Sequence, residues 1–183
     1  MLNAIVPLPD GGFLASHFYE RGPDSAAARE RALAGEISGE LLEWHARTGW
    51  SKVPGSDGSG PNGVEVSPDG NWVYFAEWGR YSFSRMPLHG DQPRRETIKL
   101  DFRPDNVHWG QDGLLLLAGQ TDTESNVVKI DPMTLRVTEL IRRPDSEVFR
   151  HGTTAVEVNG EIWLSTSRGD RIAIYPLAPR STP

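Results

Sequence analysis

Three side chains with oxygen donors recur at one fixed distance from a turn. Asn3, Asn62 and Asp105 each lie seven residues before an aspartate that is followed by glycine, at positions 10, 69 and 112. Asn106, next to Asp105, can supply a further oxygen. Amide and carboxylate oxygens with few charges suit a hard cation, and Ca²⁺, which takes about 6–8 oxygen ligands, is the expected ion. The spacing therefore predicts a calcium site formed by these four residues, provided that the fold brings them together.

Each predicted ligand opens a repeated unit of polar cluster, strand, turn and strand. The Asp-Gly turns, and a weaker copy that ends in Asn159-Gly160, are typical of β-hairpins. From turn to turn, Asp69 to Asp112 spans 43 residues and Asp112 to Asn159 spans 47. These periods suit the four-stranded blades of a β-propeller, in which the first strands line a central tunnel and equivalent residues converge.

The sequence divides into three blades and most of a fourth. We expect the blades at 1–53, 62–101 and 104–143, a final hairpin at 152–176 and a frayed tail at 178–183. Residues 25–34 have a helix-forming composition and predict one inserted helix, either a lid at the rim or a plain surface helix. The Gly- and Ser-rich run 54–60 is expected to be a flexible connector. The fold class is therefore all-β, a partial β-propeller with one short inserted helix.

A second set of candidates follows the second strand of each hairpin. Because that strand returns to the level where the first began, these residues share a face with the predicted metal ligands and would line a concave substrate pocket. They are Phe18, Glu77, Trp78, Gln120 and Ser167, with His151 just before the last hairpin. His17 is the candidate base, because histidine changes its charge near neutral pH. A structural interpretation stays open, since Asn and Asp often cap strands and a lone His is often a hydrogen-bonded rim residue.

Composition restricts the partners and the compartment. The formal net charge is −6 and the chain has no cysteine. Nucleic acids and anionic membranes require clustered Lys and Arg, so neither is an expected partner, and disulfides and thiolate metal sites are excluded. No apolar run approaches the length of a membrane span and Met1 is not followed by a signal-peptide pattern, so we expect a cytoplasmic protein.

The motifs around these residues resemble a known superfamily. Leu2-Asn3, Pro61-Asn62-Gly63 with its Ser-Pro-Asp-Gly turn, and Asp105-Asn106 are similar to the calcium-dependent six-bladed propellers of paraoxonase/arylesterases, gluconolactonase (senescence marker protein) and strictosidine-synthase-like proteins. The Asp-Asn pair, the insertion after the first hairpin and residues 152–156 are most similar to the C-terminal part of the paraoxonase branch. The resemblance implies that Asn3, Asn62, Asp105 and Asn106 contribute to a catalytic calcium site, and that the activity is hydrolysis of lactones or carboxylic esters.

Compared with the six-bladed family, this chain supplies too few blades for a complete ring. The family's N-terminal acidic ligand and N-terminal His pair have no counterpart here. An open stack of blades exposes strand edges and core, so we expect a second copy, a partner chain or a missing N-terminal portion to complete the ring. Closure of the four blades on their own is a third alternative. Two functions stay open. One is a calcium-dependent lactonase or esterase in which water attacks the carbonyl, and the other is a non-catalytic propeller segment or interaction module with a structural calcium.

Overall fold

The computed structural model describes residues 1–90 and 94–177. The chain forms two compact units, Met1–Val107 and His108–Pro183. The tail at 178–183, for which the sequence predicts fraying, lies outside the described residues. Within the described ranges, no helix is long and apolar enough to cross a membrane.

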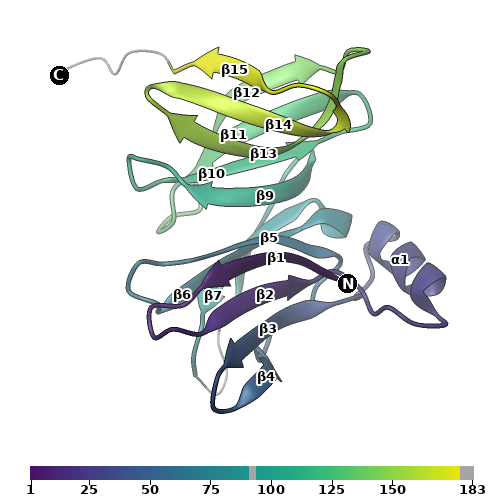
Figure 1. Ribbon diagram of the computed structural model, residues 1–183, viewed down its shortest axis with the longest axis vertical. Helices are drawn as coiled ribbons and strands as arrows, with labels where there is room; N and C mark the ends of the chain where they lie inside the picture. Colours follow the sequence, from purple (N-terminus) through teal and green to yellow (C-terminus); the bar gives the residue numbers. More distant parts are fainter. Residues whose placement is uncertain (91–93, 178–183) are drawn as a thin grey trace. The chain divides into compact units, whose positions relative to one another are not determined.

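The first unit contains two four-stranded sheets in which every strand pairs antiparallel with the next one in sequence (Figure 1). The first sheet consists of β1 (Leu2–Pro7), β2 (Phe13–His17), β3 (Glu40–His45) and β4 (Gly49–Lys52). The second consists of β5 (Pro61–Val66), β6 (Trp72–Glu77), β7 (Ser82–Pro87) and β8 (Glu96–Lys99). This meander is the pattern of a propeller blade.

Two further meanders follow along the chain. The third sheet, whose first strand crosses the boundary between the units, consists of β9 (Arg103–Trp109), β10 (Leu115–Gln120), β11 (Glu124–Ile130) and β12 (Val137–Pro144). The last sheet has three strands, β13 (Phe149–Val158), β14 (Glu161–Gly169) and β15 (Ala173–Pro176). In the described residues, these sheets confirm an all-β, propeller-type chain with three complete blades and most of a fourth.

Asp-Gly turns join the first two strands of the blades, as the sequence predicts. Gly11 and Gly70 have φ of 90° and 74°, which glycine adopts without steric cost. The Asp69 carboxylate accepts hydrogen bonds from Ser67 Oγ at 2.5 Å and from the Asn71 backbone N–H at 3.1 Å. The bond from Ser67, together with those from Asn71, lowers the pKa of the Asp69 carboxyl. These local bonds stabilise the turn between β5 and β6.

The core of the first unit lies between its two sheets. Leu14 and Leu41 of the first sheet pack with Val73 and Phe75 of the second, and all four side chains are fully buried. In the second unit, an equivalent cluster contains Leu116, Leu164 and their neighbours. Alternating apolar residues on facing sheets produce both clusters.

The inserted helix α1 (Ser25–Leu33) packs against the first unit near the 3-10 turn η1 (Trp78–Arg80). Ala28 and Ala32 are buried. A Cβ atom on Gly79 would lie 1.9 Å from the carbonyl oxygen of Ala32, so only glycine allows this approach. The helix lies at the end of the sheet where β6 ends, and its buried alanines show that it is docked.

The connector at 54–60 is held by hydrogen bonds, so the expectation of a flexible segment is wrong. Ser56 and Ser59 are fully buried. Ser56 Oγ donates to the Val53 carbonyl at 2.7 Å, and Ser59 Oγ donates to the Ala32 carbonyl at 3.0 Å. Composition alone indicated flexibility, but the small serine side chains fit beneath neighbouring segments and satisfy their backbone groups.

A cluster of charges joins the two sheets of the second unit. Lys129 Nζ bonds Asp112 and lies 2.6 Å from Glu157 Oε1. Their side chains are 12%, 23% and 5% exposed, respectively. Burial opposes the charge on Lys129, but the hydrogen bonds to Asp112 and Glu157 raise its pKa above the usual value. Removing the lysine would leave two carboxylates without their shared cation.

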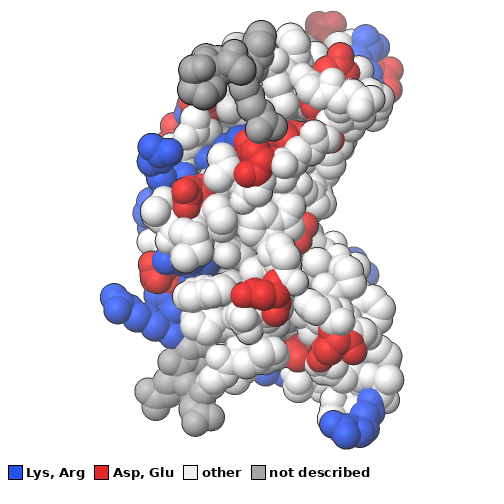
Figure 2. Space-filling model, turned by 90° about the vertical axis from the view of Figure 1, so that its left-hand side faces the viewer, with Lys and Arg blue, Asp and Glu red and all other residues white. Residues whose placement is uncertain are grey.

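Charged side chains are distributed over the surface. On the face shown in Figure 2, Lys and Arg are interspersed with Asp and Glu among uncharged residues. On this face acidic side chains lie among the basic ones, and the formal net charge of the whole chain is −6.

Candidate functional site

The predicted ligands of the first unit lie where inner strands begin, and its predicted pocket residues lie where second strands end. His17, the last residue of β2, pairs with Leu2, and Glu77, the last residue of β6, pairs with Pro61. Both β1 and β2 pack beside β5. Both sets of residues therefore lie at the same end of these strands.

Both predicted asparagine ligands lie in β-bulges. The register of β1 with β2 shifts around Asn3, and the register of β5 with β6 shifts around Asn62. A bulge bends its strand and changes the direction of the side chain, and bulges are frequent beside active sites. Asn3 is exposed, whereas Asn62 is 3% exposed. The spacing from the turn located these positions, but the bulges themselves could not be read from the sequence.

Gly63 brings β5 against β9. A Cβ atom at this position would lie 2.4 Å from the carbonyl oxygen of Asp105 and 2.6 Å from Cα of Asn106. The two backbones therefore meet directly, which glycine alone permits. Asn106 Nδ2 donates to Asp105 Oδ1 at 3.0 Å. The structure thus brings Asn62, Asp105 and Asn106 to adjacent strands at one place in the first unit.

The side-chain oxygen of Asn62 tests whether these residues could hold the expected cation. Asn62 Oδ1 is buried and has no hydrogen-bond partner in the described chain. Leaving such an acceptor unsatisfied costs about 1–3 kcal/mol. A cation held by amide and carboxylate oxygens would satisfy it. The described residues contain no group of three His, Cys, Asp or Glu side chains that could hold a metal, so amide oxygens would have to supply most of the ligands. The residues present therefore fit Ca²⁺.

His17 has a carboxylate partner that the sequence did not reveal. Its Nδ1 lies 2.7 Å from Glu40 Oε1, and the two side chains are 12% and 24% exposed. Its Nε2 lies 3.6 Å from Glu20, whose side chain is 80% exposed. If Nδ1 donates to Glu40, Nε2 is the nitrogen that can accept a proton. Glu40 is 23 residues away in sequence, so only strand pairing identifies it.

Phe18 and Trp78 form an aromatic wall at this end of the strands. Their ring centroids are 6.1 Å apart. The Phe18 ring closes over Gly60, where a Cβ atom would lie 2.7 Å from the ring. Ser38 fixes this segment, because its Oγ donates to the Phe18 carbonyl and accepts from the Gly60 backbone N–H, each at 2.9 Å. Both aromatic residues remain predicted pocket residues.

Glu77 is engaged by its own blade. The side chain is 1% exposed and forms an ion pair with Arg95. Its carboxylate also accepts from Ser59 N–H and Ser82 Oγ, each at 3.1 Å. Burial lowers the pKa of the Arg95 guanidinium, while the charge of Glu77 opposes that shift. These contacts give Glu77 an architectural role at the site, and its contact with substrate stays a prediction.

The remaining predicted pocket residues belong to the second unit. Gln120 is the buried last residue of β10 and pairs with Ser125. His151 has φ of 55°, and its backbone N–H lies 3.2 Å from Asp145 Oδ2. Ser167 is exposed on β14. Their role as pocket residues stays a prediction.

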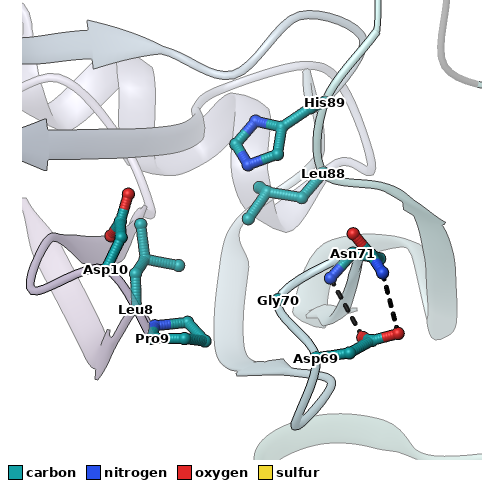
Figure 3. A pocket seen from close by; sticks show the side chains of 8 residues that line it. All are labelled: Leu8, Pro9, Asp10, Asp69, Gly70, Asn71, Leu88 and His89. Atoms are coloured by element: carbon teal, nitrogen blue, oxygen red, sulfur yellow. Dashed lines mark hydrogen bonds between the residues drawn. The ribbon is translucent and has the colours of Figure 1, made fainter.

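A small cavity lies at the opposite end of the first unit's strands. It has a volume of 160 Å³ and lies at the turns that carry Asp10 and Asp69, with Leu88 and His89 on its other side (Figure 3). Figure 3 shows Asn71 bonded to Asp69 at its edge. Because a hairpin turn lies at the far end from the start of its first strand, this cavity is separate from the candidate site.

Solved structures share this fold. A provisionally assigned 6-phosphogluconolactonase from Bacteroides uniformis matches with a TM-score of 0.64 and 15% identity over 97% of this chain and 51% of its own. Regucalcin from Agrobacterium tumefaciens, a calcium-binding protein, matches with a TM-score of 0.63 and 17% identity. The match covers 92% of this chain and 54% of regucalcin. Virginiamycin B lyase from Staphylococcus aureus matches with a TM-score of 0.60 and 15% identity. The match covers 98% of this chain and 56% of the lyase.

The chain spans about half the length of these structures. No protein-family model and no curated protein matches the sequence. At such identities the likeness shows the β-propeller fold alone, and it does not favour the paraoxonase branch.

Proposed function

We propose that this chain belongs to a calcium-dependent hydrolase of lactones or carboxylic esters. The protein from Bacteroides uniformis supports the lactone class, and regucalcin supports calcium as the ion. The lyase has the same fold, so the fold does not select the reaction. The proposed reaction therefore depends on the residues of the site.

The buried oxygen of Asn62 is the observation that carries the proposal. It has no hydrogen-bond partner among the described residues, and Gly63 allows its strand to lie against Asp105 and Asn106. Asn62, Asp105 and Asn106, with Asn3 from the neighbouring strand, would hold the ion. When bound, Ca²⁺ supplies positive charge that polarises a carbonyl group and stabilises the developing oxyanion.

His17 is the proposed base. Glu40 orients the imidazole through Nδ1, which leaves Nε2 to take a proton from water as the water oxygen bonds to the carbonyl carbon. The bond between that carbon and the ester oxygen then breaks. The leaving alkoxide takes the proton back from His17, which gives the acid and the alcohol, or a hydroxy acid from a lactone. Phe18 and Trp78 exclude water from one side.

The relation to the paraoxonase branch and the completed ring are parts of the same proposal. The Asp105-Asn106 pair is the feature that supports that branch. We propose that Gln120, His151 and Ser167 of the second unit are also pocket residues. Further blades then come from a second copy or from additional chain.

Calcium removal and an asparagine variant test the proposal. Hydrolysis of δ-valerolactone and phenyl acetate is measured before and after chelation, and calcium binding is measured by titration calorimetry. We expect Asn62→Ala to weaken calcium binding and hydrolysis at least about tenfold, whereas Asn71→Ala, at an exposed turn, leaves both unchanged. Undiminished hydrolysis after chelation, or in Asn62→Ala, would contradict the metal mechanism. Calcium-dependent thermal stabilisation without turnover would instead support the non-catalytic propeller segment.

A further inference from the structure

Arg103 lies beside the candidate site, and its guanidinium contacts two aromatic rings. It is the first residue of β9, two positions before Asp105. Its Cζ lies 4.1 Å from the centroid of Trp78 and 4.5 Å from that of Tyr81. Tyr81 directly follows η1 and has a φ of 53°, a backbone conformation that is uncommon for a non-glycine residue. The two rings hold the guanidinium in place.

The guanidinium has no anionic partner in the described chain. Nη1 is buried without a hydrogen bond, and no described carboxylate forms an ion pair with Arg103. Other half-buried arginines of this unit are paired, since Arg85 lies 3.1 Å from Glu96 and Arg95 bonds Glu77. A charged donor without an acceptor is costly to bury. The arrangement is that of a binding group that still lacks its acceptor.

We infer that Arg103 binds an anionic group of the substrate, a carboxylate or phosphate a few bonds from the carbonyl that reacts. The inference rests on the proposed function and specifies its substrate class. A guanidinium that lies over aromatic rings keeps its planar fork of N–H donors, which can form bidentate hydrogen bonds to an anion. Side chains two positions apart on a strand point to the same face about 7 Å apart. Arg103 and Asp105 can therefore contact two groups of one small molecule.

The second unit provides a matched control. Arg143 lies 5.2 Å from the Phe149 ring and 5.9 Å from the Tyr175 ring, so it too contacts two aromatic side chains. Its Nη1, however, donates to Tyr175 Oη at 2.6 Å. Arg143→Met removes a similar stacked cation that already has an acceptor within the chain.

The test compares two lactones of the same ring size. γ-Butyrolactone is neutral, and γ-carboxy-γ-butyrolactone carries one carboxylate. We expect the wild-type chain to prefer the carboxylated lactone, and Arg103→Met to lower kcat/KM for it about tenfold to a hundredfold while the neutral lactone changes less than about twofold. Arg103→Lys, which keeps the charge but not the planar fork, should lose part of the preference. Arg143→Met should keep it.

Binding separates this inference from the proposed reaction. Titration calorimetry with 2-hydroxyglutarate, the product of the carboxylated lactone, and with inorganic phosphate measures anion binding even if neither lactone is hydrolysed. Binding that weakens in Arg103→Met and Arg103→Lys, in variants whose thermal unfolding remains cooperative, supports the anion site, and the tighter ligand identifies the preferred anion. Equal binding in wild type and Arg103→Met, or an equal loss of activity on both lactones, would overturn it.

Discussion

At the residue scale, the pairing of His17 with Glu40 distinguishes a catalytic candidate from an ordinary rim histidine. The two side chains are mostly buried and 2.7 Å apart. Gly39 lets the segments approach, since a Cβ atom there would lie 1.7 Å from the His17 carbonyl oxygen. The carboxylate selects one imidazole tautomer, and the other nitrogen is left for proton transfer.

Glu40→Gln tests this role. An amide can present its NH₂ group to Nδ1 and favour the wrong tautomer, so we expect kcat for lactone hydrolysis to fall about tenfold or more with little change in KM. His45→Gln is the control, because His45 also contacts a carboxylate, Glu43 at 2.6 Å, but lies at the other end of β3. Steady-state kinetics on δ-valerolactone decide the matter. Equal rates for wild type and Glu40→Gln would remove Glu40 from the mechanism.

At the element scale, the site depends on how closely two inner strands approach. The bulge at Asn62 changes the direction of the ligand, and Gly63 allows the backbones of β5 and β9 to meet. A side chain at residue 63 would collide with backbone atoms, which cannot rotate away as a flexible side chain does. The geometry of the proposed calcium site and the stability of the first unit are therefore linked.

We expect Gly63→Ala to destabilise the chain by about 3 kcal/mol, because its Cβ would lie 2.4 Å from the Asp105 carbonyl oxygen. Urea unfolding followed by tryptophan fluorescence measures the change. Gly22→Ala is the control, since a Cβ atom there meets nothing within 4 Å, and its stability should change by less than about 0.5 kcal/mol. If Gly63→Ala and Gly22→Ala unfold at the same urea concentration, the close contact of the two strands is not present in solution.

At the scale of the whole molecule, the first and last sheets each have an uncovered apolar face. On the first sheet, Ile5, Phe13 and Trp50 are 62%, 40% and 49% exposed. On the last sheet, Val156 and Ile174 are 40% and 50% exposed. Strands of the intervening sheets, such as β6 and β10, are buried on both faces. Apolar sheet faces of this kind normally pack against another layer.

We expect the chain to self-associate through these faces, with a solution mass above the 20.3 kDa of one copy. Trp50→Glu combined with Ile174→Glu should shift the mass to that of a monomer, because each change places a charge in an apolar contact. Met133→Glu should leave the solution mass unchanged, because Met133 is 65% exposed in a turn outside both faces. Light scattering with and without calcium measures the mass. A strictly monomeric wild type would contradict self-association, and additional chain would then have to cover the faces.

Local features of the chain followed from the sequence by itself. Asp-Gly turns, alternating strands and the alanine-rich helix depend on interactions between near neighbours, so their pattern predicted the blades. The equal spacing of Asn3, Asn62 and Asp105 from their turns likewise placed them at equivalent strand positions.

Only the tertiary structure decided which groups meet across long stretches of chain. It placed Glu40 beside His17, Arg103 against Trp78 and Tyr81, and Ser56 within hydrogen-bond distance of Leu41. It also showed that Asn62 Oδ1 is buried with no hydrogen-bond partner among the described residues. None of these contacts has a sequence period, because each depends on which strands pack together and how closely their backbones approach.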